Sequence, residues 1–300
     1  MNKRPLHLRR SWLFVGATDE KAIRSSFNCK ADVCILEFED FCSPENRPLG
    51  RKMLPDILRK WKTLGKVTAV RVNTLEIEDG KKDLEVAISK NLDVLLLPKV
   101  NSKKQVDRLL RQKRKIEVKK KISKNKIEFI PNIETALGII NINEILNTKF
   151  ITGALVASED MGTSLGIKDL KNNEMLNHIR KKFHLACSAF GKTAIDMPYT
   201  FNSLEGLIKE TKYIKKLGMT AKSTVNYSHC DIINQILTPS ISEFKKAEAV
   251  IKYFKKAFQN GKRQIYLKGH YLEIPSYISA RKISERYKEF LLYDEPNVII

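Results

Sequence analysis

The sequence predicts an α/β fold, a (β/α)8 TIM barrel with a C-terminal helical and hairpin lid extension. Two observations support the barrel. Eight short apolar segments recur along the chain, and amphipathic stretches with helical spacing separate them. Alternation of strand and helix sustained eight times favours a closed parallel sheet over an open one. The chain of 300 residues is long enough for such a barrel, which typically needs about 250, and for a tail.

The eight apolar segments resemble buried parallel strands because they are short and mostly apolar until they end. They cover residues 12–17, 33–40, 67–73, 94–100, 127–134, 154–160, 193–199 and 220–226. Nearly all of them end in charged or polar side chains. A (β/α)8 barrel collects its active site at the carboxyl ends of its strands. The segments therefore predict one site, assembled from distant parts of the sequence.

The stretches between these segments fit helices because their apolar residues recur on one face. They cover residues 19–28, 49–64, 80–90, 103–115, 142–146, 172–189 and 203–217. Ser102 is placed to cap the helix that begins at residue 103, and Gly218 is placed to end the last of these helices.

The pattern changes after the eighth segment, so the sequence predicts a barrel domain over residues 1–236 and an extension over residues 237–300. Ser240 and Glu243 match a capping box at the start of a helix. A short hairpin around Gly269 and a last helix follow, over residues 264–267, 270–274 and 276–291. A barrel does not need this extension, which is expected to act as a lid or to cover a neighbouring subunit.

The formal net charge is +21, from 55 Lys and Arg against 34 Asp and Glu. Nucleic-acid binding is still not expected, because lysines occur in nearly every predicted helix and the densest run, residues 111–126, lacks interleaved aromatic residues. Apolar runs stay well short of the roughly 20 residues that span a bilayer. The apolar run after the basic N-terminus is too short for a signal peptide, and the five cysteines lack metal-ligand spacing. A cytoplasmic protein with reduced thiols is expected.

Two acidic residues predict a metal site. Glu134 ends the fifth segment and Asp160 ends the sixth, so adjacent strands would bring the two carboxylates within reach of one cation. Two carboxylates, with water and substrate oxygens as the other ligands, are typical of Mg²⁺. The alternative is that both carboxylates are solvated at the starts of loops. Each residue alone favours that alternative, whereas the pair at strand ends favours the metal.

Arg71 ends the third segment and predicts an anion-binding group. An arginine that points into a barrel mouth loses hydration unless an anion faces it. Its forked guanidinium suits a carboxylate, which it binds through two hydrogen bonds. The alternative is an internal salt bridge to Glu39 or Asp40, and both arrangements can hold together.

Two lysines raise a different mechanism. A desolvated lysine such as Lys99 or Lys222 can form a Schiff base with a carbonyl substrate. Lys222 lies early in the eighth segment, where a buried pair with an acid such as Asp196 is the better interpretation. Imine chemistry is therefore the less favoured mechanism.

The motifs at these strand ends resemble those of the citrate lyase β-subunit-like proteins, with the malyl-CoA and citramalyl-CoA lyases, in the 2-keto-acid aldolase superfamily. They are RRSWLFV at residues 9–15, LEFED at 36–40, VRVN at 70–73, LPK at 97–99, IETALG at 133–138 and SED at 158–160. The resemblance runs in order from Arg9 to about Ala280. The chain departs from the family pattern at Gly16-Ala17, where Pro-Gly is usual, at Ala157 and at Tyr227.

The resemblance implies roles for several residues. Glu134 and Asp160 match the Mg²⁺ ligands of the family, and Arg71 matches the arginine that binds the keto-acid or hydroxy-acid moiety. Residues 269–275 are similar to a C-terminal lid, whose acid completes the site of a neighbouring subunit; in this chain that acid is Glu273. Proteins of this family are usually trimers, so a homotrimer is expected.

These observations together predict a Mg²⁺-dependent carbon–carbon lyase that cleaves or forms a 3-hydroxyacyl thioester, such as citryl-, malyl- or citramalyl-CoA. The products would be a keto acid and an acyl thioester, carried on CoA or on a protein-bound group. Besides Arg71, the expected catalytic residues are Glu39, Asp40 and Glu273, and the expected substrate-binding residues are Lys99, Asn226 and Arg10. Two alternatives are a thioester-independent 4-hydroxy-2-keto-acid aldolase and a catalytically weak barrel that acts as a binding protein.

Overall fold

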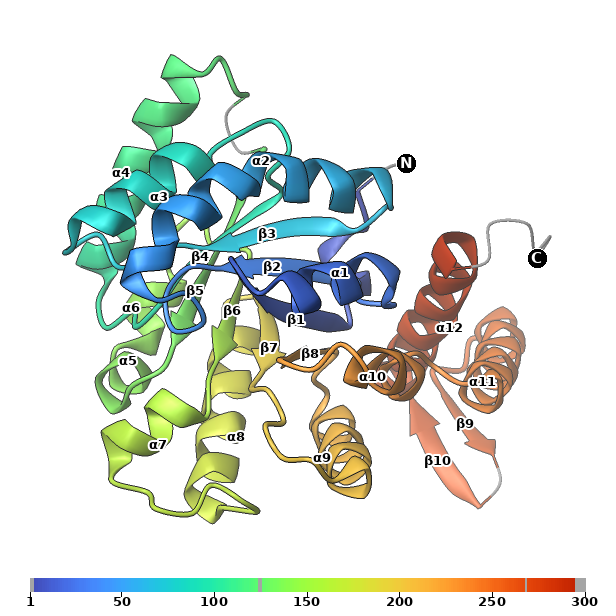
Figure 1. The fold of residues 1–300 in the computed structure, drawn as a ribbon. Helices are drawn as coiled ribbons and strands as arrows, with labels where there is room; N and C mark the ends of the chain where they lie inside the picture. Colours follow the sequence, from blue (N-terminus) through green and yellow to red (C-terminus); the bar gives the residue numbers. More distant parts are fainter. Residues whose placement is uncertain (1–2, 124–125, 268, 295–300) are drawn as a thin grey trace. The chain divides into compact units, whose positions relative to one another are not determined.

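The computed structural model, which describes residues 3–123, 126–267 and 269–294, confirms the (β/α)8 barrel (Figure 1). Eight parallel strands lie in chain order around a closed barrel, and β8 pairs with β1 to complete the ring. The strands are β1 (Ser11–Gly16), β2 (Val33–Glu37), β3 (Val67–Arg71), β4 (Val94–Leu97), β5 (Glu128–Ile133), β6 (Gly153–Val156), β7 (Thr193–Asp196) and β8 (Ala221–Thr224). Residues 124–125 of the lysine-rich run lie outside the described residues.

Helices surround this barrel. They are α1 (Glu20–Asn28), α2 (Arg47–Thr63), α3 (Glu78–Ala87), α4 (Lys103–Lys119), α5 (Ala136–Ile140), α6 (Ile142–Leu146), α7 (Glu159–Leu165), α8 (Glu174–Ala189), α9 (Leu204–Leu217) and α10 (His229–Leu237). All seven helices expected from the sequence are present, and the bounds of α6 match the prediction. The sequence prediction missed α5, α7 and α10. These three helices have five, seven and nine residues. α7 begins at Glu159, within residues 154–160, which the sequence assigns to the sixth strand segment.

The strands end earlier than the sequence predicts. Glu39 and Asp40 follow β2 in a loop, Lys99 follows β4, and Asp160 lies in the first turn of α7. A run of apolar residues does not reveal at which residue the hydrogen bonds between strands stop, so the polar residues that follow a strand cannot be told from its last residues in the sequence. The backbone of Lys99 marks one such end, because its φ of 51° is incompatible with a strand. The polar residues therefore sit on short turns just beyond the barrel.

Apolar side chains fill the inside of the barrel. They come from alternate positions of the strands, as the period of two requires, and comprise Trp12, Phe14, Val33, Ile35, Val67, Ala69, Val94, Leu96, Ile130, Leu155, Ile195 and Ala221. A second apolar cluster packs between the strands and the helices. The barrel is thus a packed core and not a pore, which leaves the carboxyl ends of the strands as the place for a polar site.

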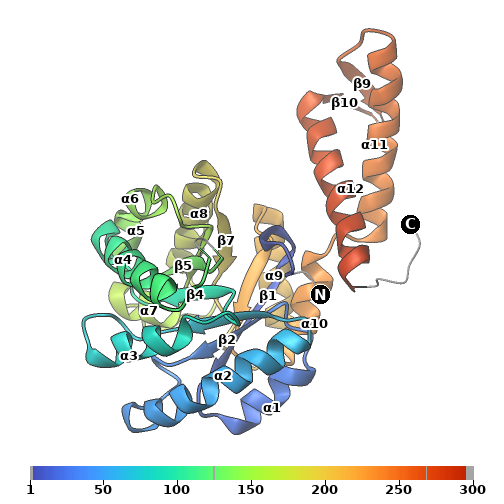
Figure 2. The ribbon, with the colours of Figure 1, turned by 90° about the horizontal axis from the view of Figure 1, so that it is seen from above.

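The chain divides into two compact units, Met1–Leu237 and Thr238–Ile300. The second unit contains α11 (Ile241–Gln259), the antiparallel strands β9 (Gln264–Leu267) and β10 (His270–Glu273), and α12 (Ile274–Asp294). The predicted capping box is confirmed, since Ser240 and Glu243 exchange hydrogen bonds of 2.7 and 3.1 Å. Figure 2 shows α11 and α12 side by side, and Phe244 stacks on Tyr287 at 4.4 Å between ring centroids. The hairpin is also confirmed, with Gly269 at a φ of 84°.

No helix in the described part of the chain combines the length and the apolar character that crossing a lipid bilayer requires.

Candidate active site

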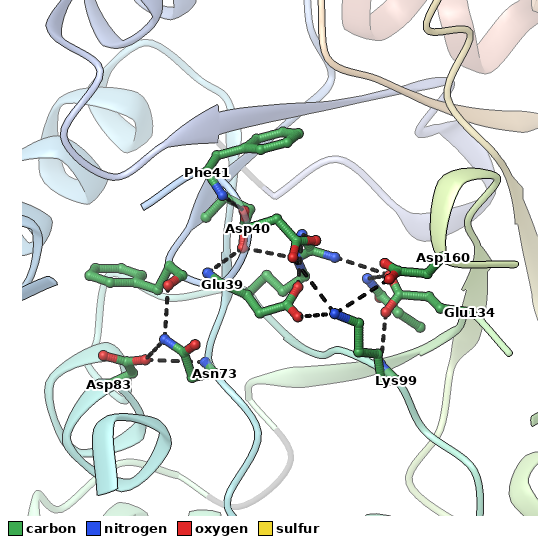
Figure 3. A network of polar contacts seen from close by, with 12 residues as sticks. Glu39, Asp40, Phe41, Asn73, Asp83, Lys99, Glu134 and Asp160 are labelled. Carbon is green, nitrogen blue, oxygen red and sulfur yellow. Dashed lines mark hydrogen bonds and ion pairs between the residues drawn. The ribbon is translucent and has the colours of Figure 1, made fainter. Parts of the chain in front are cut away.

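Charged side chains from the carboxyl ends of strands β2 to β6 converge on one place (Figure 3). They are Glu37, Glu39, Asp40, Arg71, Lys99, Glu134 and Asp160, called the carboxylate cluster below. Six of these seven were expected at a site from the sequence. Glu37 was not.

Arg71 lies at the centre of the carboxylate cluster and is 5% exposed. Its Nε donates to Glu37 at 3.0 Å, and its Nη1 donates to Glu134 at 3.0 Å. Its Nη2 lies 3.1 Å from Asp40 and 3.2 Å from Glu39. The predicted salt bridges of Arg71 to Glu39 and Asp40 are therefore confirmed. Burial opposes the charge of Arg71, but the carboxylates of Glu37 and Glu134 outweigh that effect and raise its pKa.

Lys99 joins both sides of the carboxylate cluster. Its backbone N–H donates to Glu134 at 2.8 Å, which the left-handed backbone at this residue makes possible. Its Nζ donates to Glu39 at 2.5 Å and lies 3.4 Å from Asp160 and 3.6 Å from Asp40. Burial disfavours the charge, but the hydrogen bond to Glu39 and the nearby acids raise the pKa of Lys99. The ammonium group therefore stays protonated at neutral pH.

Glu37 organises the loop that follows β2. This residue has no exposed surface, and its carboxylate accepts hydrogen bonds from the backbone N–H groups of Glu39 at 2.6 Å and Phe41 at 2.7 Å. Asn73 supports the same loop, because its side-chain amide donates to the carbonyl of Phe38 at 2.8 Å. The sequence holds one signal for Glu37: an acid inside an otherwise apolar buried segment, which requires a buried partner.

The carboxylate cluster carries an excess of negative charge. Among the described residues it contains five carboxylates and two cationic side chains, a formal excess of three. Burial raises the pKa of Glu39 to about 7, and the neighbouring Asp40 adds to this effect. Burial also raises the pKa of Glu134. Burial disfavours the charged form of both carboxylates, and a nearby cation would favour it.

The donor atoms of the site fit Mg²⁺. Glu134, which is 1% exposed, and the half-exposed Asp160 offer carboxylate oxygens, the ligands that this hard cation prefers. The amide oxygen of Asn132 is buried and has no hydrogen-bond partner within the described residues, while its Nδ2 donates to Glu134 at 3.2 Å. No group of three or more His, Cys, Asp and Glu among these residues forms a complete metal site. Oxygens of substrate and water would have to complete the ligand shell.

Arg10 lies at the other end of the barrel, so the prediction that it binds substrate at this site is wrong. It precedes β1, and its guanidinium donates to the Asp32 carboxylate at 2.8 and 2.9 Å. In a parallel barrel, residues before a strand and residues after it lie on opposite faces. The pair connects the starts of β1 and β2 and has a structural role.

Asn226 and Glu273, also expected at the site, lie in different units of the chain. Asn226 follows β8 on the expected face, and its side-chain oxygen accepts from the N–H of Ser228 at 3.0 Å and from its hydroxyl at 2.9 Å. Glu273 is exposed at the end of β10 in the second unit, where it pairs with Gln264. Their roles at the site remain predictions.

A second buried ionic group includes Asp196 of β7 and Lys222 of β8. Lys222 donates to Asp196 and Glu210 at 2.7 Å and to the carbonyl of Met197 at 2.6 Å, which confirms the predicted pair with Asp196. Arg180 joins the same acids, at 2.7 Å to Asp196 and 2.8 Å to Glu210. Three acceptors hold the three N–H groups of Lys222, so its amine is not available as a nucleophile.

Solved structures share this fold. The citrate lyase beta subunit of M. tuberculosis complexed with oxaloacetate and magnesium matches 78% of this chain and all of its own chain, with 25% identity and a TM-score of 0.63. The protein CitE from the same organism, in complex with magnesium, acetoacetate and coenzyme A, matches 93% of this chain and 98% of its own, with 24% identity and a TM-score of 0.73.

Curated proteins of similar sequence are named enzymes. Citramalyl-CoA lyase, mitochondrial, of Mus musculus is 26% identical and the match covers 92% of this chain and 85% of that protein. Citrate lyase subunit beta of Leuconostoc mesenteroides is 25% identical, with 92% of each chain covered. The (3S)-malyl-CoA thioesterase of Cereibacter sphaeroides is 25% identical, with coverage of 92% and 93%. The model of the HpcH/HpaI aldolase/citrate lyase family matches residues 10–227, which span the whole barrel, so this chain belongs to that family of enzymes.

Proposed function

We propose that this protein is a Mg²⁺-dependent carbon–carbon lyase that acts on a 3-hydroxyacyl thioester, such as citryl-, malyl- or citramalyl-CoA. One observation carries the proposal. Glu134 and Asp160 offer oxygen ligands beside Arg71, in a cluster with an excess of negative charge. A relative of 25% identity is complexed with oxaloacetate, a keto acid, and magnesium, and other relatives are named lyases of CoA thioesters.

Arg71 would hold the carboxylate of the substrate through Nη2. Its Nε and Nη1 are committed to Glu37 and Glu134, both of which are almost fully buried. Its Nη2 lies 3.2 Å from Glu39 and 3.1 Å from Asp40, whose side chain is 42% exposed and can move aside. Arg71 is thus held by Glu37 and Glu134 and keeps one nitrogen, Nη2, for an incoming anion.

Glu39 is the proposed acceptor for the proton of the substrate hydroxyl, because it lies 3.2 Å from Nη2 of Arg71, where the substrate carboxylate would bind, and its pKa of about 7 suits proton exchange at neutral pH. Loss of that proton allows the carbon–carbon bond to break, which gives a keto acid and a thioester enolate. Protonation of the enolate carbon completes the reaction, and Glu273 is the proposed donor. When bound between Glu134 and Asp160, Mg²⁺ would supply Lewis-acid stabilisation of negative charge on oxygen.

The direct test is to incubate the full-length protein with Mg²⁺ and each of citryl-CoA, malyl-CoA and citramalyl-CoA, and to measure keto acid and acyl thioester release. A 4-hydroxy-2-keto acid without a thioester is the comparison substrate. Turnover of a CoA thioester supports the proposal. Turnover of the free acid alone would replace it with the aldolase alternative, and binding without turnover of either would favour a binding protein.

We expect no covalent intermediate on a lysine. Lys99 stays protonated among acids, and Lys222 is held by three acceptors. Treatment with a keto acid such as pyruvate and sodium borohydride should therefore leave the mass of the intact protein unchanged. A mass gain that peptide mapping assigns to Lys99 or Lys222 would contradict the metal-based mechanism.

We also propose that the active site is shared between subunits of a homotrimer, with Glu273 supplied by a neighbour. The resemblance of residues 269–275 to a lid motivates this proposal, and an acid on a lid suits a proton transfer that is shielded from water. Glu273→Ala and Asp160→Asn should each be inactive alone and should regain activity when the two chains are co-expressed. Mixed oligomers with no regained turnover would mean that Glu273 serves its own subunit or has no catalytic role. A monomer in sedimentation would exclude sharing altogether.

A further inference from the structure

A cavity of about 610 Å³ lies between α8 and α9, beyond the end of β7. None of the seven side chains of the carboxylate cluster lines it. Its volume is within the range of roughly 300–1,000 Å³ that is typical of small-molecule sites. The function proposed above does not use this cavity.

The floor of the cavity is a preorganised polar surface. Arg180, which is 4% exposed, and Glu210 both line it. Arg180 donates through Nε to Asp196, through Nη1 to Asn177 at 2.9 Å, and pairs through Nη2 with Glu210. These contacts occupy three of the five N–H donors of its guanidinium. Buried charges that are fixed in this way are costly to maintain for stability alone.

The buried charges at the floor of the cavity sum to zero, so the net charge of the cavity depends on the other charged residues that line it. Arg180 and Lys222 oppose Asp196 and Glu210 in one network. The remaining charged lining residues are Lys171, Lys209 and Glu205, which leave one net positive charge. The N-terminal ends of α8 and α9 begin beside these residues and add positive partial charge. The cavity therefore favours an anion.

The cavity also has apolar walls and unused polar groups. Tyr199 and Phe201 line it as an edge-to-face pair, with 5.3 Å between ring centroids, and Leu176 lies among the other lining residues. Ser158 lines it too, is 6% exposed, and its hydroxyl has no hydrogen-bond partner within the described chain. A ligand with an apolar body and an acidic group would match both kinds of wall.

We propose that this cavity is a second binding site, which takes a small organic anion with a phosphate or carboxylate group on an apolar body. The anion would lie between Lys171 and Lys209 above Arg180, and the apolar body would lie against Tyr199 and Phe201. This proposal does not depend on the lyase reaction proposed above.

The test is calorimetric titration of the full-length protein with phenyl phosphate and with benzoate, which distinguish the two acidic groups. Inorganic phosphate lacks the body and benzyl alcohol lacks the charge, so both should bind at least about tenfold more weakly than the better organic anion. If inorganic phosphate binds as tightly as the organic anions, the apolar body contributes nothing to binding, and the proposal is overturned. So would the absence of binding by both organic anions.

Two variants on α9 provide a matched pair. Lys209 lines the cavity, whereas Lys212 is exposed on the same helix and does not line it. Lys209→Glu should weaken the binding of the organic anion at least about tenfold, because a like charge then faces it. Lys212→Glu changes the net charge equally and should have little effect. Equal losses in both variants, or none in Lys209→Glu, would overturn the proposal. Asp160→Asn should leave this binding intact, which separates it from the metal site.

Discussion

Arg71→Lys should lower kcat/KM for the proposed thioester substrate by about 30-fold or more, which corresponds to about 2 kcal/mol of transition-state stabilisation. Arg71 spans Glu37 and Glu134 through two nitrogens and presents the third to the open side. The ammonium group of lysine is a point charge without this fork, so it cannot hold both buried acids and a substrate carboxylate. Steady-state kinetics with the best substrate measure the loss.

A matched control is available at the opposite end of the barrel. Arg9 is 1% exposed and binds Glu128 through two hydrogen bonds of 2.7 and 3.0 Å. Arg9→Lys therefore removes the same kind of buried bidentate pair and should lower thermal stability while leaving kcat/KM close to that of the wild type. If Arg71→Lys keeps its kcat/KM, Arg71 belongs only to a structural pair and does not bind substrate.

If the proposed metal dependence is right, EDTA should abolish activity and Asp160→Asn should weaken Mg²⁺ binding at least about tenfold. The substitution would replace one of the two proposed anionic ligands by a neutral amide. The side chain of Asp160 is 32% exposed and lies in the first turn of a short helix, so the fold should stay intact. Calorimetric titration with Mg²⁺ alone measures the affinity, and EDTA followed by added Mg²⁺ tests whether activity is lost and restored.

Glu159→Gln is the control for this second variant. Glu159 is the adjacent acid, but its carboxylate accepts a hydrogen bond from Thr200 at 2.9 Å and lies outside the carboxylate cluster. Glu159→Gln removes the charge of this carboxylate and should leave Mg²⁺ affinity unchanged. Full activity in EDTA would contradict metal dependence, and equal losses of affinity in both variants would mean that general charge, and not ligation, attracts the cation.

The sequence was sufficient to predict the barrel, because strand and helix periods alternate cleanly over eight repeats. It also pointed to Arg71, Glu134 and Asp160, since charged residues at the ends of apolar segments must face the mouth of a barrel. It did not reveal Glu37, whose position inside a segment hides its contact with Arg71. Only the register of the barrel, which pairs Glu37 with Arg71 on the next strand, brings those two side chains together.

The wrong prediction for Arg10 comes from the same kind of argument that pointed to Arg71, Glu134 and Asp160, namely the position of a charged residue at the edge of an apolar segment. Arg10 precedes its strand, whereas Arg71, Glu134 and Asp160 end or follow theirs, and the face of a barrel on which a residue lies depends on that order. The proposed role of Glu273 could not be derived from the residues alone either, because it would depend on how one folded unit meets another. Such contacts between units leave no periodic pattern in a single chain.

The pairing of β1 with β8, which closes the barrel, affects how the chain folds during translation. β1 pairs with β8 through Ser11 and Lys222, so the ring cannot be completed until about three-quarters of the chain has left the ribosome. Until then, β1 and the newest strand each have an edge with unpaired N–H and C=O groups, which can join other chains. Contacts over such a separation also slow folding. The nascent barrel is therefore most exposed to aggregation during translation of its last strands, and chaperones would protect it most at that stage.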